Sequence, residues 1–256
     1  MKKIAVGGKG GSGKSSTVTL LAGALRDRGY RVLVVDSDES NPALFRMLGL
    51  DERPAPLLDL VGGKSRVFQA FSEGEYGTGS LMTRETIHLD DIPSDYVATS
   101  DGISMVCIGK ILESLEGCAC PMGVLAREFL KRLSLAEDEV ALIDLEAGIE
   151  HFGRGVETSV DSMLIVTEPS LDSLELAEKM NTLAEEVGMA NVWTILNKVP
   201  SEELGARLRE ELEDRGASVI GTLAHDPEIL RSGLHGNPIT STRARQAMDQ
   251  IVEKLV

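Results

Sequence analysis

Glycines and lysines that could bind phosphate are concentrated near the N-terminus, where residues 7–16 read GGKGGSGKSS. The glycines match the G-x-G-x-x-G of a dinucleotide site, and the run from Gly8 to Ser15 also matches the G-x-x-x-x-G-K-[ST] of a nucleotide triphosphatase. Only the triphosphatase uses the Lys-Ser pair, in which Lys14 binds the phosphates and Ser15 binds Mg²⁺. The pair therefore favours a Mg²⁺-dependent nucleotide triphosphatase.

The same loop should also bind phosphate oxygens through its backbone. It follows an apolar strand and opens a helical pattern, and the N–H groups at a helix N-terminus converge on anions. Glycine permits both the turn and the close approach of the phosphates. The residues expected to bind the nucleotide here are Gly10, Gly11, Ser12, Gly13, Lys14, Ser15 and Ser16.

Two acids, Asp36 and Asp38, stand at the carboxyl end of the second apolar run, in VVDSDES. Asp36 also occupies the place of the ribose-binding acid in a dinucleotide site, about twenty residues after the loop. Beside a triphosphatase loop, a carboxylate can instead orient the waters of Mg²⁺ or the attacking water. We expect Asp38 to position the attacking water, with Lys14 as a second catalytic residue, and Asp36 is the next candidate for either acid role.

The elements that must position these residues alternate along the chain. Strand-length apolar runs occur at 3–8, 31–36, 102–109, 139–145, 162–168, 191–197 and 218–224. Helical patterns occur at 14–28, 123–133, 170–187, 201–215 and 242–255. Continuous apolar strands are typical of a sheet that is buried on both faces. We therefore predict a doubly wound α/β fold of the P-loop NTPase type, with a mainly parallel sheet of about seven strands flanked by helices.

We expect residues 1–256 to form a single domain, because no linker separates a second one. The stretch 51–101 is rich in Gly, Pro, Ser and acidic residues and lacks strong periodicity, so we predict an insertion with mobile parts there. The last helical pattern, 242–255, has an apolar stripe and few, mixed charges. This favours docking onto the protein's own sheet over a membrane-targeting tail.

Charge and composition limit the partners. Lys and Arg total 26 against 41 Asp and Glu, so the formal net charge is −15, which repels nucleic acid and anionic lipid. We expect no nucleic acid and no membrane as partners. Three cysteines are too few for a disulfide framework, and there is no signal peptide or apolar run of about 18 residues, so we expect a cytoplasmic protein.

Two of the cysteines form a C-x-C pair, Cys118 and Cys120, in LEGCACPMG just before a predicted helix. Two thiolates are half of a tetrahedral soft-metal site, and a two-fold dimer would supply the other half. The alternatives are two ordinary thiols or a redox pair. Cys107 lies inside the apolar run SMVCIG and is expected in the core.

The loop GKGGSGKS resembles the deviant Walker A loop, K-G-G-x-G-K-[ST], of the MinD-like ATPases, a branch that includes nitrogenase iron protein, the arsenite-pump ATPase and the partition ATPases. The resemblance implies a homodimer in which Lys9 reaches the partner's phosphates and acts as a catalytic residue. Such a lysine would act like an arginine finger supplied in trans.

Later segments match further elements of this family. In ALIDLEAGIEH, Asp144 resembles the acid that holds Mg²⁺ through water, and Ala147-Gly148 resembles the start of a switch that senses the γ-phosphate. His151, beside the switch, is expected to be hydrogen-bonded rather than a metal ligand.

The base-binding segments also follow the family. In ILNKV, Asn197 resembles its adenine-reading asparagine, and TLAHDPE, with Leu223 and His225, resembles the loop that covers the base. Pro200 stands where a guanine-specific N-K-x-D loop has aspartate, so ATP and ADP are expected rather than guanine nucleotides.

The loop, the C-x-C pair and AGIEHFGRG together are similar to the CooC nickel-insertion ATPases, which serve carbon monoxide dehydrogenase and acetyl-CoA synthase. The similarity implies that Cys118 and Cys120 bind Ni²⁺ or Zn²⁺ between protomers, and that the client is a nickel enzyme. Two other functions stay open: an iron–sulfur carrier or reductase-type ATPase that uses the same cysteines, and a positioning or partitioning ATPase, which the charge of −15 disfavours.

Overall fold

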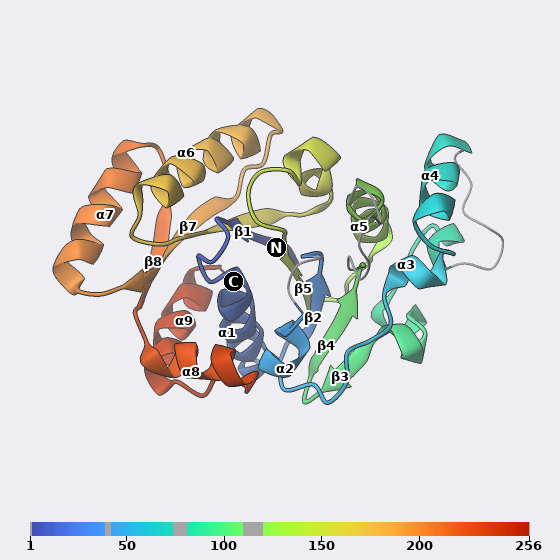
Figure 1. Ribbon diagram of the computed structural model, residues 1–256, viewed down its shortest axis with the longest axis horizontal. Helices are drawn as coiled ribbons and strands as arrows, with labels where there is room; N and C mark the ends of the chain where they lie inside the picture. The colour runs from blue at the N-terminus through green and yellow to red at the C-terminus, as the bar shows by residue number, and fades with distance from the viewer. Residues whose placement is uncertain (1, 39–41, 74–80, 110–119, 256) are drawn as a thin grey trace.

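An eight-stranded sheet forms the centre of the computed structural model, which describes residues 2–38, 42–73, 81–109 and 120–255 (Figure 1). The strand order is β3-β4-β2-β5-β1-β6-β7-β8, and every neighbouring pair is parallel except β3 and β4. The strands are β1 (Lys3–Gly8), β2 (Arg31–Asp36), β3 (Ala98–Ser100), β4 (Ile103–Cys107), β5 (Glu139–Asp144), β6 (Ser162–Thr167), β7 (Val192–Val199) and β8 (Val219–Ala224). The predicted parallel strands are confirmed, and β3 adds an antiparallel edge.

Helices connect the strands. They are α1 (Lys14–Asp27), α2 (Leu44–Met47), α3 (Leu57–Leu60), α4 (Lys64–Glu73), α5 (Cys120–Arg132), α6 (Leu171–Glu186), α7 (Glu202–Asp214), α8 (Pro227–His235) and α9 (Thr242–Leu255). Short 3₁₀ turns lie at Leu81–Thr83, Leu89–Asp91, Ser94–Tyr96, Phe152–Arg154 and Val156–Ser159. The five predicted helices are confirmed to within three residues at each end. The sequence patterns missed α2, α3, α4 and α8; α2 and α3 have only four residues each and show little periodicity.

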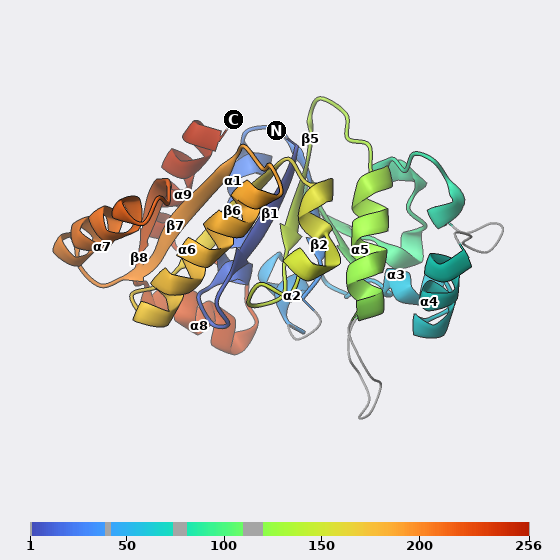
Figure 2. The same cartoon turned by 90° about the horizontal axis from the view of Figure 1, so that it is seen from above.

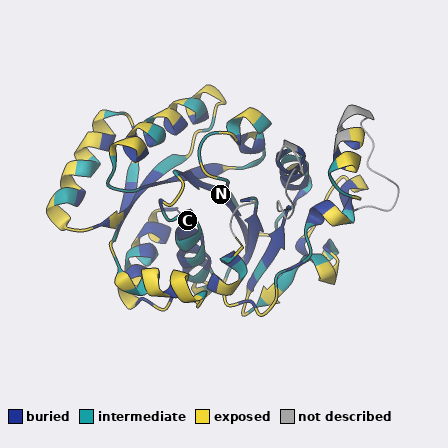
Figure 3. Ribbon diagram, in the orientation of Figure 1, coloured by how far each residue is buried: buried dark blue, intermediate teal, exposed yellow. Residues whose placement is uncertain are grey.

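The sheet is buried on both faces (Figures 1 and 3). Side chains that alternate along the strands enter two different cores. Ala5 and Ile143 belong to the core beneath α5 and α6, whereas Ile4 and Leu142 belong to the core beneath α1 and α9. This two-sided burial explains why the strands read as continuous apolar runs.

The strand order reverses at β1. From β1 the chain first builds the side of the sheet that carries β2 and β4, and later the side that carries β6, β7 and β8. The strand register pairs Val6 of β1 and Asp36 of β2 with Asp144 of β5. The carboxyl ends of these strands therefore meet at the switch point, where open α/β sheets bind ligands.

The segment 51–101 is built of short elements that pack against the edge of the sheet and against α5. Val67, Met82 and Ile87 are buried in the same core as α5. Ile87 donates its N–H to the carbonyl of Arg132 at 2.9 Å and accepts from the N–H of Ser134 at 2.8 Å. The described part of the insertion thus supplies core side chains as well as the edge strand β3.

Helix α9 docks onto β8 and α1, as the sequence predicts. Its side chains Met248, Ile251 and Val252 are buried in the core on that face of the sheet. Within the described ranges, no helix combines the length and apolar character needed to cross a bilayer.

Two glycine-to-alanine substitutions should change stability in opposite directions. A Cβ at Gly221 of β8 would lie 2.3 Å from Cγ1 of the buried Ile251, so Gly221→Ala should lower the free energy of unfolding by roughly 1–3 kcal/mol. A Cβ at Gly23 of α1 would meet no atom within 4 Å, so Gly23→Ala should raise it by about 0.5–1 kcal/mol. Urea unfolding of both variants checks the signs, and a stabilised Gly221→Ala would contradict the packing argument.

Candidate functional site

The loop between β1 and α1 has a backbone that only glycine adopts easily. Gly11 and Gly13 have φ angles of 81° and 98°, and Gly13 caps the N-terminus of α1. A Cβ at Gly8 would lie 2.4 Å from the carbonyl oxygen of Val166 on β6. The loop therefore lies against the sheet edge and leaves the first-turn N–H groups of α1 available for an anion.

Acids gather beside this loop. Asp36, Asp38 and Asp144 are all buried, and the side chain of Lys14 is almost fully buried as well. The hydroxyl of Ser15 donates to Oδ2 of Asp144 at 2.7 Å, and Oδ1 of Asp144 is buried without a hydrogen-bond partner. The structure thus brings together the residues that the sequence assigns to Mg²⁺ and to phosphate.

This crowding perturbs the titration of Asp144. Its pKa is raised to about 7, chiefly by burial and also by the nearby charges of Asp36 and Asp38, whereas the Ser15 hydrogen bond and the Lys14 charge oppose the increase. A cation at the unpaired oxygen would relieve both the burial and the repulsion.

The donor set fits Mg²⁺. Hydroxyl and carboxylate oxygens are the protein ligands that Mg²⁺ prefers, and Mg²⁺ usually keeps waters and substrate phosphates as its other ligands. Ser15 and Asp144, with Asp36 beside them, supply such oxygens at the mouth of the phosphate loop. In the described part of the chain, no three His, Cys, Asp or Glu side chains form a metal-holding group.

Lys9 is held inside its own chain. Its Nζ lies 3.5 Å from Oδ2 of Asp172 and 3.9 Å from Oε1 of Glu168. Lys198 bonds the same Glu168 at 2.9 Å and also donates to the carbonyl of Gly11. The sequence reasoning missed these acids, because their approach to the loop depends on the tertiary packing of β6 and α6.

Asn197 also binds the phosphate loop. Its Nδ2 donates to the carbonyl of Ser12 at 2.8 Å, and a Cβ at Gly13 would lie 2.2 Å from the same nitrogen. A cavity of about 400 Å³ opens beside this contact. It is lined by Gly11, Gly13, Ser16, Asn197, Lys198, Ala224, His225, Asp226, Ile229, Leu230, Gly233 and Leu234.

Two leucines of α8 give this cavity an apolar wall. Leu230 and Leu234 are 68% and 77% exposed, which is unusual for leucine, and both line this cavity. Their four-residue spacing in PEILRSGLH is a signal that the sequence reasoning missed. Of the residues expected to cover the base, His225 lines the pocket, whereas Leu223 is buried in the core with α9.

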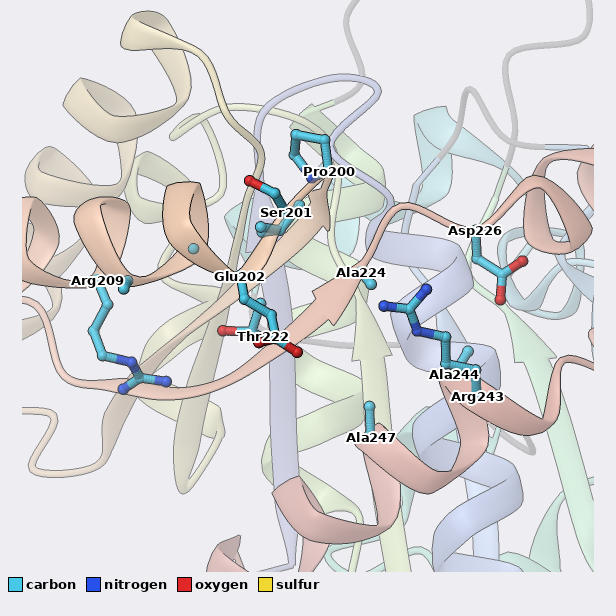
Figure 4. Close-up of a pocket in the computed structure, with 13 residues that line it drawn as sticks. Pro200, Ser201, Glu202, Arg209, Thr222, Ala224, Asp226, Arg243, Ala244 and Ala247 are labelled. Atoms are coloured by element: carbon cyan, nitrogen blue, oxygen red, sulfur yellow. The ribbon is translucent and has the colours of Figure 1, made fainter.

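A second cavity of about 430 Å³ adjoins the first (Figure 4). It lies between α7 and α9 at the carboxyl ends of β7 and β8, and it shares Ala224 and Asp226 with the first cavity. Arg209 and Arg243 reach it from the two helices. Arg209 is engaged there, because its Nη1 donates to the carbonyl of Val219 at 2.6 Å.

The segment after β5 approaches the loop from the other side. Gly148 donates its N–H to the carbonyl of Gly8 at 3.2 Å. His151 is buried and hydrogen-bonded through Nδ1 to Glu157, which confirms the expectation that it is paired.

The cysteines divide into two groups. Cys107 is fully buried in β4, as predicted for a core residue, and its sulfur accepts a hydrogen bond from Nη2 of Arg53 at 3.2 Å. Cys120 is the first residue of α5, and Cys118 lies outside the described residues. The C-x-C metal site therefore stays a prediction.

A glycine loop that joins β1 to α1, a Lys-Ser pair, and acids on the neighbouring strands define a P-loop nucleotide-binding protein. The chain belongs to the family of the CobQ/CobB/MinD/ParA nucleotide-binding domain, whose model matches residues 3–239. The MinD-like resemblance of the sequence is thereby confirmed.

Individual relatives extend this result. The chain is 40% identical over 239 residues to an uncharacterised ATP-binding protein of Methanocaldococcus jannaschii. The aligned region covers 93% of this chain and 94% of the relative. It is 39% identical over 202 residues to the carbon monoxide dehydrogenase accessory protein CooC of Rhodospirillum rubrum, with coverage of 78% and 75%. The solved MinD of Pyrococcus horikoshii, complexed with Mg-ADP, shares the fold with a TM-score of 0.72 and 20% identity, over 99% of this chain and 95% of that one.

The raised pKa of Asp144 predicts a pH-dependent stability. In the folded chain this group holds its proton up to about pH 7, whereas it releases it near 3.8 when unfolded. The folded state therefore binds more protons between these values, and the free energy of unfolding should fall as the pH rises through the window. Urea unfolding of the nucleotide-free protein with a chelator present should show this slope, and Asp144→Asn should flatten it.

Asp161 provides a control of opposite sign. Although partial burial opposes the change, the backbone N–H groups of Lys2 and Lys3 bond its carboxylate and lower its pKa. Asp161→Asn should therefore remove stability that is present above the unfolded pKa and lost as the pH falls. A wild-type slope retained in Asp144→Asn would show that another group causes it.

Proposed function

We propose that this chain is a dimeric ATPase that inserts nickel into a client enzyme of the carbon monoxide dehydrogenase or acetyl-CoA synthase type. The observation that carries the proposal is the C-x-C pair in the sequence, whose second cysteine, Cys120, opens α5, in a chain that also has a MinD-type loop. The similarity to the CooC accessory protein supports the choice of metal and client. In this proposal ATP drives dimerisation, and hydrolysis releases the dimer.

The loop and its acids would do the chemistry on ATP. The first-turn N–H groups of α1 and Lys14 would hold the phosphates, and Ser15 with Asp144 would hold Mg²⁺. Bound Mg²⁺ would neutralise charge on the phosphate oxygens. Asp38 would orient the attacking water, since it follows β2 at the same edge of the sheet.

The base would enter the pocket between Asn197 and α8. Nδ2 of Asn197 is already bonded to the loop, so its Oδ1 is the atom that would accept from the amino group of adenine. Leu230 and Leu234 would cover a face of the base. These contacts support ATP as the nucleotide.

Lys9 would exchange partners when two chains meet. Its present ion pair with Asp172 is partly exposed, so breaking it costs at most about 1 kcal/mol. A partner's phosphate oxygens carry more charge than one carboxylate and lie in a drier place, so they would attract Lys9 more strongly. Transfer of Lys9 to the partner would supply the charge that stabilises the transferring phosphoryl group.

The cargo would lie on the two-fold axis. Cys118 and Cys120 of each chain supply two thiolates, and the pair from a second chain would complete a set of four for Ni²⁺ or Zn²⁺. An iron–sulfur cluster on the same four thiolates is the alternative. The visible spectrum of anaerobically purified protein separates the two, because a cluster gives broad brown absorption, whereas a colourless apo-protein that then takes up Ni²⁺ supports nickel insertion.

The trans role of Lys9 predicts that turnover depends on the partner. Hydrolysis per chain should rise with protein concentration, and Lys9→Ala should bind ATP normally yet lose roughly 10³-fold in hydrolysis. Lys179→Ala, on an exposed part of α6, is the matched control and should behave like wild type. Equal hydrolysis by Lys9→Ala would reduce Lys9 to a surface residue.

The shared site predicts one Ni²⁺ or Zn²⁺ for every two chains. Cys118→Ser and Cys120→Ser should each lose this binding, because two sulfur ligands disappear from each site. Cys107→Ala should keep the stoichiometry, since Cys107 is buried in β4. Metal analysis after gel filtration gives the ratio. One metal per monomer, or full binding in both serine variants, would contradict the shared site.

A further inference from the structure

The segment that follows Asp144 touches the phosphate loop through its backbone. The N–H of Gly148 donates to the carbonyl of Gly8 at 3.2 Å. A Cβ at Gly10 would lie 3.6 Å from the Cβ of Ala147, so these two backbones pass close to each other. A conformational change of the loop on nucleotide binding must therefore displace the backbone at residues 147 and 148.

Two shielded pairs brace the remainder of this segment. Nη1 of Arg154 is paired with Oε1 of Glu146, and the two side chains are only 19% and 16% exposed. Nδ1 of His151 is bonded to Oε1 of Glu157, with exposures of 2% and 1%. Breaking a pair from which water is largely excluded leaves a desolvated charge, so such pairs resist separation. Residues 146–157 are thereby tied into one unit.

The other side of this unit packs on the first turns of α5 (Figure 2). A Cβ at Gly123 would lie 2.3 Å from Cδ of Arg154 and 3.2 Å from its Cβ and Cγ. Nη1 of Arg127 donates to the carbonyl of Arg154 at 3.3 Å. The aliphatic stem of Arg154 therefore lies directly on the backbone of α5 at Gly123. Gly123 comes three residues after Cys120, the first residue of this helix.

We propose that Arg154 is a positioning residue that transmits the nucleotide state of the phosphate loop to the first turn of α5. Glu146 lies two residues after Asp144, so any shift of Ala147 and Gly148 moves its carboxylate. When Glu146 shifts, the guanidinium of Arg154 moves with it because the two are paired. The aliphatic stem of Arg154 then moves toward or away from the backbone of α5 at Gly123. The consequence for metal rests on the proposed function, because Cys120 opens this helix.

The test compares Zn²⁺ affinity with and without the Mg²⁺ complex of AMPPNP, a non-hydrolysable ATP analogue. Competition with a chromophoric chelator gives the affinity. For wild type the two values should differ by a factor of roughly 5 to 150. Arg154→Met keeps the stem over Gly123 but loses the ion pair, so this factor should fall to about one, with little change in the Zn²⁺ affinity measured without nucleotide or in the AMPPNP affinity measured without Zn²⁺.

Two further variants separate coupling from general damage. Arg154→Lys keeps a positive charge near Glu146 and should retain much of the factor. Arg132→Met removes a comparable pair, Arg132 with Glu128, from the last turn of the same helix, and should retain all of it. Loss of the factor in Arg132→Met as severe as in Arg154→Met would overturn the assignment to Arg154.

Hydrogen–deuterium exchange keeps this inference distinct from the proposed function. Adding AMPPNP and Mg²⁺ without metal cargo should change the protection of α5 amides in wild type, and Arg154→Met should lose that response. If the protein binds no Zn²⁺ or Ni²⁺ while this difference persists, the proposed cargo is wrong and the coupling stands. An α5 that ignores the nucleotide in wild type, or an Arg154→Met response equal to wild type, would overturn the coupling.

Discussion

The accumulation of negative charge at the buried ends of β2 and β5 is the constraint on which the rest of the site depends. Asp36 and Asp144 are register partners on adjacent strands, and water reaches neither freely. Burial disfavours the charged form of Asp144 and the neighbouring Asp36 carboxylate adds to the effect, which is why the pKa of Asp144 rises to about 7 although Ser15 and Lys14 lie beside it. The protein's own groups compensate only part of this charge. The edge of the sheet is therefore arranged to receive a cation, and a Mg²⁺–phosphate complex matches both the missing positive charge and the anion-binding N–H groups of α1.

The sheet topology and the loop geometry serve this same constraint. Because β1 lies between β5 and β6, the loop that leaves it is placed over the acids on one side and against Val166 on the other. The left-handed conformation at Gly13 lets α1 begin with its N-terminus at the loop. Asn197 then holds the loop from β7 by bonding the carbonyl of Ser12. The phosphate-binding conformation is thus set by contacts within the chain, which lowers the conformational cost of binding a nucleotide.

The features that could be predicted from the sequence are those that a local residue pattern determines. The buried strands and long helices were predictable because their periodicity runs over many residues. The motif spacing indicated Lys14 and Ser15, and the family resemblance indicated Asp144, as residues that would lie near one another. The four-residue helices α2 and α3 and the three-residue edge strand β3 were not, since so few residues carry no clear period. The ion pair of Lys9 with Asp172 joins residues far apart in the chain, and it follows from how α6 packs beside the loop. No local pattern encodes such a pair.

The ion pairs around the loop differ in how easily they separate, because they differ in burial. In the pair of Lys9 with Asp172, the side chain of Asp172 is 80% exposed. Solvent therefore screens the attraction, and an incoming phosphate can compete for the lysine. The pair of Arg154 with Glu146 is shielded on both sides, so separation would strand a desolvated charge. When the phosphate loop changes its conformation, Lys9 can therefore leave Asp172 for another anion. Arg154 and Glu146 must instead stay paired and move together. The first kind suits a charge that is to be donated to a neighbour, and the second suits transmission of a displacement to α5.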